Sequence, residues 1–351
     1  MKLSDMNRDA MQAQMHADLE GSRRRRDNRI RFVRERLSRP EQVETRLGAG
    51  EPVRFNTLSL PGWLKIADLA RVPHIPAREI LSVPTEAYFD LMDDKPSEAG
   101  ARIREIPSLL REGEVLRMEQ VAPQSVKSAR AYGQPLGNGL DEGVFDLMDI
   151  RFIDTLMDLH EDQVRFLARP VVPTRDMPGS YRGRDGSFPE EYRVIVQGGR
   201  LIGISNYYPQ TRMSPETHAG QMREAVGIAA RLMGVMRDRD IAPFNPGLPE
   251  HPEGPSFTLD LLTREDGELL FLEGGPAAMQ AAHPCCFLDE ESRTIRGKPP
   301  LHGAAFSMTD EVLPLEAIGV DISALPDLSG MSQPGPEDWE GSGPEQAPTG
   351  P

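Results

Sequence analysis

Hydrophobic residues in the second half of the chain fall into paired short runs, a pattern that predicts β-hairpins. Residues 191–208, EYRVIVQGGRLIGISNYY, place two such runs around Gly198-Gly199, whose backbones can adopt the positive φ angles of a tight turn. This turn would pair Val196 with Leu201 and Arg193 with Ile204. Both faces are largely apolar, so we expect an interior pair of strands. One face would carry Arg193, Ile195, Ile202, Ile204 and Asn206, and the other Tyr192, Val194, Val196, Leu201 and Tyr207.

A second hairpin is predicted over residues 257–276, where FTLDLLT and ELLFLE flank a turn that ends in Asp266-Gly267. A two-residue loop would pair Leu262 with Phe271 and Asp260 with Glu273. A longer loop, residues 264–267, would shift the partners but keep both acids on one face. Facing carboxylates repel each other unless a cation lies between them, and Mg²⁺ suits such a pair. An ordinary hairpin with solvated surface acids is the alternative.

Other segments predict a mixture of helices and strands. A helix should begin at Pro215 and run to Arg237. Further helices are expected over 85–92, over 101–113 with an interruption before Pro107, and over 145–160. Strands are expected over 114–119, which carries Arg117, and over 163–172, which carries Arg165 and Arg169. Small α and β elements should fill 54–84. The buried stripe of the long helix would consist of Met222, Ala225, Val226, Ile228, Ala229, Leu232 and Val235.

The predicted fold class is α+β, with four parts along the chain. Residues 1–45 form an arginine-rich N-terminal helical arm, residues 46–112 a mixed α/β subdomain, residues 113–324 the domain with both hairpins, and residues 325–351 a disordered acidic tail rich in proline and glycine. Two polar, glycine-containing loops are expected over 134–143 and 173–189. The second could close over a ligand.

Composition narrows the classes of function. The 351 residues carry a formal net charge of −15, which disfavours nucleic-acid binding as the main task. Acidic residues interrupt the arginines of the N-terminal arm, so a solvated helix or one docked on a protein partner is favoured over a nucleic-acid contact. No apolar run could span a membrane and no signal segment begins the sequence, so we expect a cytoplasmic protein. Cys285 and Cys286 are adjacent and should be reduced.

The candidate chemistry combines cationic strands with a two-carboxylate hairpin. Arginines can neutralise phosphate oxygens while a metal ion held by carboxylates bridges others, which is what a nucleoside triphosphate requires. Neither a GxxxxGK[ST] loop nor a GxGxxG sequence after a strand is present.

With these features the chain resembles the ATP-grasp superfamily over roughly residues 110–290, through EYRVIVQGGRLIGIS, the long helix, FTLDLL and LLFLEGGP. The resemblance implies two antiparallel-sheet subdomains with helices that enclose a nucleotide cleft, as in stand-alone members of bacteria and their phages. By this resemblance Arg193 would contact the γ-phosphate side of ATP, and Asp260 and Glu273 would bind Mg²⁺. Basic residues on two earlier strands would match Arg117 or Lys127, and then Arg165 or Arg169. The adenine-binding hinge would lie at 166–172, and Asn206 is a further site candidate.

The implied reaction is ATP- and Mg²⁺-dependent ligation of a small-molecule or peptide carboxylate to an amine or thiol through an acylphosphate. No Ser, Cys or His nucleophile is required. For His283 a structural hydrogen bond is favoured over a place at the substrate side. The chain departs from the family at Gly275, where the Glu-x-Asn motif has asparagine, which removes one oxygen ligand. A catalytically idle nucleotide-binding protein with a structural or assembly role is therefore the alternative.

Overall fold

The computed structural model describes residues 20, 27, 31, 37–92, 96–121, 162–181, 184–208, 211, 213–245, 251–277, 302–306 and 312–331. The predicted helix over 145–160, the loop over 134–143, Lys127, His283 and both cysteines lie outside the described residues. Within them, no helix combines the length and the apolar character needed to cross a bilayer.

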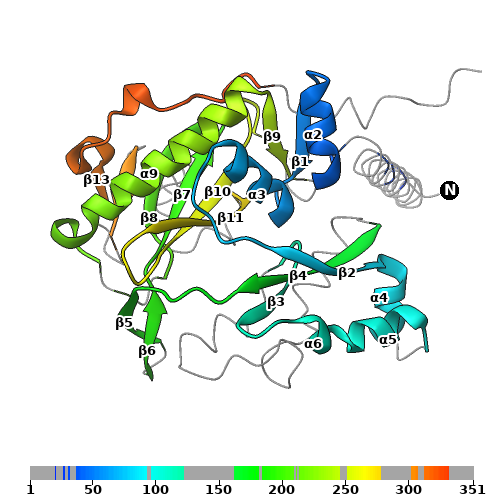
Figure 1. The fold of residues 1–351 in the computed structure, drawn as a ribbon. Coiled ribbons are helices and arrows are strands. Elements are labelled where there is room, and N and C mark those ends of the chain that lie inside the picture. The colour runs from blue at the N-terminus through cyan, green and yellow to red at the C-terminus, as the bar shows by residue number, and fades with distance from the viewer. Residues whose placement is uncertain are drawn as a thin grey trace, which may run out of the picture.

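The described chain is α+β and forms two lobes, each built on its own sheet (Figure 1). The large lobe holds a six-stranded sheet in the order β11-β10-β7-β8-β12-β13, which is antiparallel apart from the β8–β12 pair. Its strands are β7 Glu191–Gln197, β8 Arg200–Asn206, β10 Phe257–Thr263, β11 Leu269–Pro276, β12 Gly303–Ala305 and β13 Val312–Pro314. The predicted α+β class with antiparallel sheets is thus confirmed.

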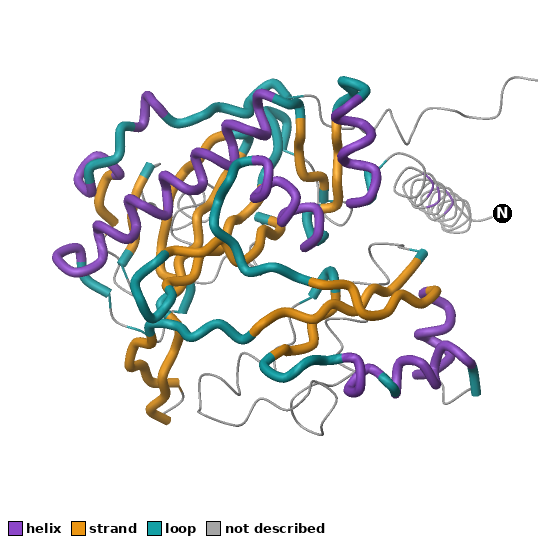
Figure 2. Tube along the Cα trace, viewed as in Figure 1, coloured by secondary structure: helices purple, strands orange, loops and turns teal. Residues whose placement is uncertain are grey.

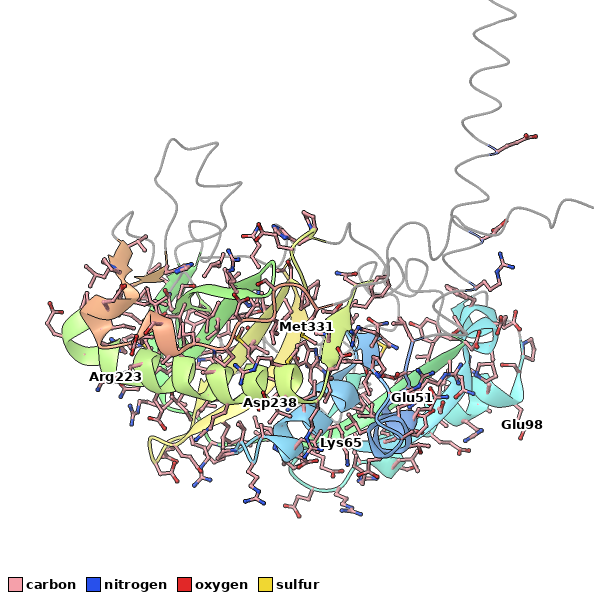
Figure 3. The ribbon with its side chains drawn as sticks, turned by 90° about the horizontal axis from the view of Figure 1, so that it is seen from above. Glu51, Lys65, Glu98, Arg223, Asp238 and Met331 are labelled. Carbon is pink, nitrogen blue, oxygen red and sulfur yellow. The ribbon has the colours of Figure 1, made fainter. Side chains whose placement is uncertain are left out.

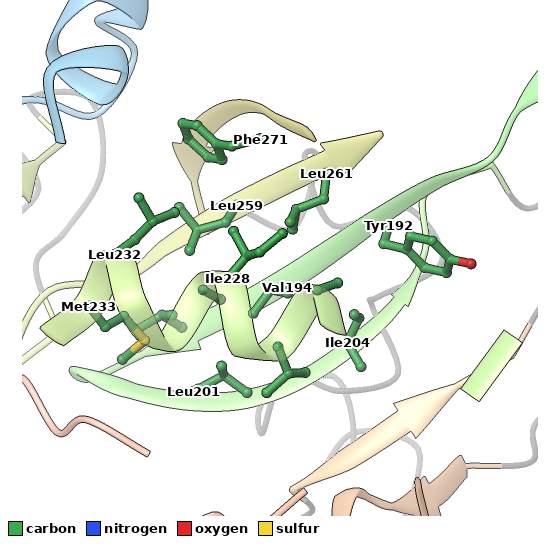
Figure 4. Close-up of a cluster of buried hydrophobic side chains, with 14 of the residues drawn as sticks. Tyr192, Val194, Leu201, Ile204, Ile228, Leu232, Met233, Leu259, Leu261 and Phe271 are labelled. Carbon is green, nitrogen blue, oxygen red and sulfur yellow. The ribbon is translucent and has the colours of Figure 1, made fainter. Parts of the chain in front are cut away.

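One long helix covers one face of this sheet. Helix α9, Pro215–Asp238, packs against β7, β8 and β11, and in Figure 3 it runs along one side of the molecule from the labelled Arg223 to Asp238. The predicted stripe is buried from Met222 to Leu232. At its C-terminal end Met233 and Met236 are buried, whereas Val235, which was expected to be buried, is half-buried. Figure 4 shows Ile228, Leu232 and Met233 packed on side chains of the strands. Each such buried side chain contributes about 1.5–3 kcal/mol.

Further elements complete the large lobe. Strands β1, Val53–Asn56, and β9, Ile241–Phe244, form a parallel pair, and helices α2, Pro40–Gly48, and α3, Leu60–Leu69, pack beside it. Ser59 caps α3 by accepting a hydrogen bond from the Gly62 backbone N–H. After β13 come the short 3₁₀ helices η3, Leu315–Ile318, and η4, Ile322–Ala324. The fully buried Leu328 shows that the chain stays packed beyond residue 325, where the sequence places the start of the tail.

The small lobe is a three-stranded antiparallel sheet in the order β2-β4-β3 (Figure 2). Its strands are β2 Arg78–Pro84, β3 Glu114–Met118 and β4 Gln163–Pro170, and its helices are α4 Thr85–Met92, α5 Glu98–Arg104 and α6 Ile106–Leu109. One sheet face packs with the helices through Val83, Leu116 and Phe166. Because side chains alternate along a strand, Arg117, Arg165 and Arg169 lie on the opposite face. On that face Leu167 contacts Leu60 and Leu64 of α3, so the face is turned toward the large lobe.

The segment predicted as a loop over 173–189 is instead a hairpin. Strands β5, Asp176–Tyr181, and β6, Arg184–Pro189, pair in antiparallel fashion, with Met177 opposite Phe188. Both of these side chains are buried. The many Gly, Asp and Ser residues between them hid the apolar alternation, so the prediction of an irregular loop was wrong. The predicted adenine hinge at 166–172 also needs correction, because β4 continues to Pro170.

A one-residue bulge changes the register in each of the two predicted hairpins. Val196 pairs with Leu201 as expected, but beyond a bulge Arg193 pairs with Ser205 rather than with Ile204. In the other hairpin Asp260 pairs with Glu273 as expected, but Phe271 pairs with Leu261 instead of Leu262. In the first hairpin the predicted register holds only from the turn to the bulge, whereas in the second the predicted Asp260–Glu273 pair appears only beyond the bulge. In both, the extra residue shifts every later pair.

Candidate functional site

The expected metal-binding acids lie side by side on the sheet of the large lobe. Asp260 and Glu273 are paired across β10 and β11 on one face of the sheet, and both are buried, with 2% and 8% exposure. Residues paired in this way have Cβ atoms about 5 Å apart. The structure therefore brings together two carboxylates that would repel each other without compensating charge.

An arginine compensates each of these acids. Arg193 donates from Nε to Asp260 Oδ1 at 2.7 Å and from Nη2 to Oδ2 at 2.6 Å, a bidentate pair in which both side chains are buried. Arg117, which reaches across from β3 of the small lobe, forms an ion pair with Glu273. Buried ion pairs of this kind contribute little net stability, but removing one partner is costly.

A third arginine lies beside them without a carboxylate of its own. Arg169 donates from Nη2 to the backbone oxygens of Ile75 at 2.8 Å and Leu272 at 3.0 Å. Within the described residues it makes no ion pair. Burial and the nearby Arg117 lower the pKa of Arg169 to about 9, although Glu273 opposes the shift. Arg117 and Arg169 thus share the one carboxylate of Glu273 and leave an excess of positive charge.

Two nitrogen atoms at this point are buried without a hydrogen-bond partner in the described part of the chain. They are Nε of Arg117 and Nε of Arg169. Buried charged donors without partners are rare because their desolvation is not repaid. Together with the excess charge, they mark a place where an anion would be stabilised.

Arg165 is not part of this group. It lies four residues before Arg169 on the same face of β4, but it is surrounded by Glu41 at 3.2 Å, Glu119 at 3.6 Å and Glu79 at 3.7 Å. Burial acts to lower the pKa of Arg165, but the hydrogen bonds that it donates to Glu41 and the charge of Glu119 raise the pKa overall. Glu119 also accepts a hydrogen bond from Ser59 Oγ at 2.6 Å. Of the two candidates on this strand, only Arg169 lies next to the acids of β10 and β11.

Asn206 does not share a face with Arg193, as the sequence register had suggested. It pairs with Tyr192, and its side-chain nitrogen donates to the Tyr208 backbone oxygen at 2.7 Å. The bulge places Ser205 and Tyr207 on the Arg193 side instead, and the Tyr207 ring lies 4.5 Å from the Arg193 guanidinium carbon. Such a contact favours the charged guanidinium. Nothing in the sequence alone signals Tyr207, because its position depends on the bulge.

Gly274 and Gly275, which follow Glu273, occupy different environments. A Cβ atom at Gly274 would lie 2.2 Å from the Trp63 ring, whereas one at Gly275 would meet only Thr258 Oγ1, at 3.4 Å. Gly275 lies on the face of Glu273, and Gly274 faces the core. Glycine is therefore required by packing at 274 but not at 275.

The donor set fits a hard divalent cation only in part. No group of three or more His, Cys, Asp or Glu side chains that could hold a metal ion occurs within the residues the structure describes. Asp260 and Glu273 would supply two carboxylates, and the remaining ligands would have to be phosphate oxygens or water, as is usual for Mg²⁺.

No family model and no curated protein matches this sequence. Among solved structures, C-terminally truncated Cdc123 from Schizosaccharomyces pombe matches with 13% identity and a TM-score of 0.43, over 75% of this chain and 96% of that one. The N5-carboxyaminoimidazole synthase of Aspergillus clavatus, in complex with ADP and 5-aminoimidazole ribonucleotide, matches with 10% identity and a TM-score of 0.32, over 75% of this chain and 59% of that one. Macrocyclase MdnC of Microcystis aeruginosa, bound with precursor peptide MdnA, matches with 12% identity and a TM-score of 0.31, over 68% and 58%. These matches assign no role to individual residues of this chain.

Proposed function

We propose that this chain is an ATP-grasp-like protein that binds ATP with Mg²⁺ between its two lobes. The observation that carries the proposal is the group of Arg117, Arg169 and Arg193 around the facing acids Asp260 and Glu273. Its cations come from both sheets, and its excess positive charge suits a polyphosphate. The order of these residues along the chain also agrees with the motifs that the sequence shares with the superfamily.

Each residue of the group has a proposed task. Arg169 and Arg117 would bind phosphate oxygens through the nitrogen donors that lack partners, and Arg193 would bind the terminal phosphate side. Asp260 and Glu273 would hold Mg²⁺, which neutralises phosphate charge. Stabilising negative charge by fixed donors is the main protein contribution to phosphoryl transfer.

The reaction we propose is carboxylate ligation. A carboxylate oxygen of a small molecule or peptide attacks the γ-phosphorus of ATP, ADP leaves, and an acylphosphate forms. An amine or thiol then attacks the acyl carbon and releases phosphate. The chain's residues position the reactants and neutralise charge, so no protein nucleophile is needed.

A second candidate is a nucleotide-binding protein without ligase activity, which serves an assembly role through the arginine-rich arm. Gly275 favours it, because the face beside Glu273 gains no side-chain oxygen at that position. Hydroxylamine separates the two candidates, since it converts an acylphosphate into a hydroxamate. Hydroxamate that forms only with ATP and an added carboxylate supports the ligase, whereas tight nucleotide binding without hydroxamate supports the assembly role. A cytoplasmic location is proposed for either.

The nucleotide site itself is tested by thermal unfolding with and without Mg²⁺-ATP. A ligand at 100 times its Kd stabilises the folded state by about 2.7 kcal/mol, which raises the unfolding temperature by several degrees. Asp260→Asn should remove this shift. The matched control is Asp240→Asn, because Asp240 also pairs with an arginine, Arg54, at 2.7 Å but lies away from the group. A shift that survives in Asp260→Asn would contradict the site assignment.

A further inference from the structure

A threonine lies on the same face of the sheet as the two acids of the proposed site. Thr258 precedes Asp260 by two residues on β10, so the two side chains project from one face. Thr258 pairs with Gly275 of β11, and Asp260 pairs with Glu273. Both pairs lie on the same side of the bulge that follows Asp260, so the alternation holds between them. These four residues therefore occupy adjoining positions on one face of the sheet.

The hydroxyl of Thr258 is buried beside the open position of Gly275. Thr258 is 2% exposed, and the residues directly opposite it are Ile195 of β7 and Gly275 of β11. A Cβ atom at Gly275 would lie 3.4 Å from Thr258 Oγ1, and it would meet no other atom within 4 Å. The hydroxyl oxygen, and not the methyl group, thus borders the space next to Glu273. Burying a hydroxyl costs free energy unless a polar group or a cation bonds to it.

We propose that the Thr258 hydroxyl is a third protein oxygen ligand for the divalent cation that Asp260 and Glu273 would hold. The inference rests on the proposed function and adds a residue to its site. Hard cations such as Mg²⁺ take oxygen ligands, and a Ser or Thr hydroxyl is among those that nucleotide-binding proteins use. Because a hydroxyl is neutral, it adds a ligand without adding to the repulsion between the two carboxylates.

The ion pair with Arg193 leaves Asp260 able to bind such a cation. Each carboxylate oxygen has two lone pairs, and Arg193 donates one hydrogen bond to Oδ1 and one to Oδ2. Residues two apart on a strand have Cβ atoms about 7 Å apart. The carboxyl group of Asp260 and the hydroxyl of Thr258 extend from these atoms, and a cation about 2 Å from each oxygen spans the remaining distance. The hydroxyl can therefore reach a cation at Asp260 while the pair with Arg193 is kept.

The test measures the affinity of the full chain for ADP by calorimetry, once with saturating Mg²⁺ and once with EDTA. Thr258→Val keeps the branched shape of threonine and removes the hydroxyl. With Mg²⁺ it should weaken ADP binding by about tenfold or more, whereas Thr258→Ser, which retains a hydroxyl, should stay within about threefold of wild type. With EDTA neither variant should differ from wild type.

The matched control is Thr263→Val on the same strand. The Thr263 hydroxyl donates to Glu190 Oε1 at 2.9 Å and has no part in the proposed site. Its loss should lower stability and leave both ADP affinities unchanged. A role of Thr258 in the sheet alone would make Thr258→Val behave like this control.

Position 275 gives the test a second arm. Gly275 has no positive φ, and a side chain there would meet only the Thr258 oxygen, so the position admits a larger residue. Gly275→Asn should restore Mg²⁺-dependent ADP binding to Thr258→Val, because its amide oxygen enters the space that the hydroxyl borders.

A further variant keeps the inference testable if Thr258→Val does not fold. Thr258→Cys replaces the hydroxyl by a thiol, and sulfur ligands favour soft cations. Relative to wild type, this variant should bind ADP more weakly with Mg²⁺ and more tightly with Cd²⁺. An unchanged preference between the two cations in folded Thr258→Cys would contradict a place for this side chain at the cation.

The outcomes separate the inference from the proposed function. If wild type binds no ADP with Mg²⁺ present, the proposed function fails and the inference fails with it. If wild type binds Mg²⁺-ADP and folded Thr258→Val binds it equally well, only the inference is overturned. A loss of the same size with EDTA would place the hydroxyl on phosphate instead of on the cation, which overturns the inference as well.

Discussion

The two arginines of β4 that face the large lobe share a strand and a face, but their surroundings differ. Arg165 has three carboxylates within 3.7 Å, from α2, from β2 and from the end of β3. Arg169 donates hydrogen bonds to two backbone oxygens and makes no ion pair within the described residues. Burial and the neighbouring cation Arg117 lower its pKa to about 9. We call these the Arg165 end and the Arg169 end of the strand. A buried arginine whose charge is balanced by nearby carboxylates holds structural elements together. A buried arginine whose charge is not balanced indicates a site for an anionic ligand.

The largest expected effect separates the two ends directly. Arg169→Met should weaken binding of Mg²⁺-ADP by about 30-fold or more, because losing one partner of a buried charged contact costs about 2–5 kcal/mol. Arg165→Met should leave that affinity within about threefold and instead lower the free energy of unfolding by about 1–3 kcal/mol. Calorimetry and urea denaturation measure the two quantities. Equal losses of affinity in both variants would remove the distinction between the ends.

A second comparison concerns Gly274 and Gly275, which follow Glu273 in β11. Gly274→Ala should destabilise the fold by about 1–3 kcal/mol or more, since its Cβ would overlap the Trp63 ring. Gly275→Ala should change stability by no more than about 0.5 kcal/mol. Both residues lie in β11, so strand propensity cancels. Urea denaturation of the pair measures the difference, and similar midpoints would mean that the Gly274 face is not packed as described.

The pH dependence of nucleotide binding should also distinguish the ends. In the free protein Arg169 loses its proton as the pH rises through about 9. Bound phosphate favours the charged guanidinium, so the complex retains a proton that the free protein has lost. Affinity should therefore be full below pH 9 and should fall above it, by up to about tenfold per pH unit.

The control for this prediction is Arg169→Met, whose weaker binding should lack the decrease above pH 9. The Arg165 end should not contribute, since the pKa of Arg165 is raised rather than lowered. Calorimetry between pH 7 and 10 would measure the slope. A decrease of the same size in Arg169→Met would assign it to another group.

The smallest expected effect on stability comes from Glu41, the exposed carboxylate that pairs with Arg165. Glu41→Gln removes a carboxylate whose side chain is 54% exposed and lies 3.2 Å from Arg165. Surface ion pairs contribute about 0–1 kcal/mol, and less at high salt. Thermal unfolding at low and high salt should show a small loss that salt reduces further, with nucleotide affinity unchanged. A loss as large as that of Arg165→Met would mean that Glu41 alone holds this end together.

Much of the local structure could be predicted from the sequence. Alternating apolar residues and the turns at Gly198-Gly199 and Asp266-Gly267 give both hairpins of the large lobe, and the stripe from Met222 to Leu232 gives α9. The sequence also predicted the opposition of Asp260 and Glu273, but in the structure the bulge between Asp260 and Leu261 produces it. These features depend on residues close in sequence, where turn geometry and side-chain alternation decide the outcome.

Only the tertiary structure decided which charges meet. The bulge between β7 and β8 placed Ser205 and Tyr207 beside Arg193 and moved Asn206 to the other face, at a point that the turn does not control. The choice of Arg169 over Arg165 depends on acids contributed by α2, β2 and β3, far apart in the chain. The sequence thus determined the strands, while the bulge brought the two acids face to face. The packing of the lobes determined their arginine partners, because charge pairing depends on distances across the fold.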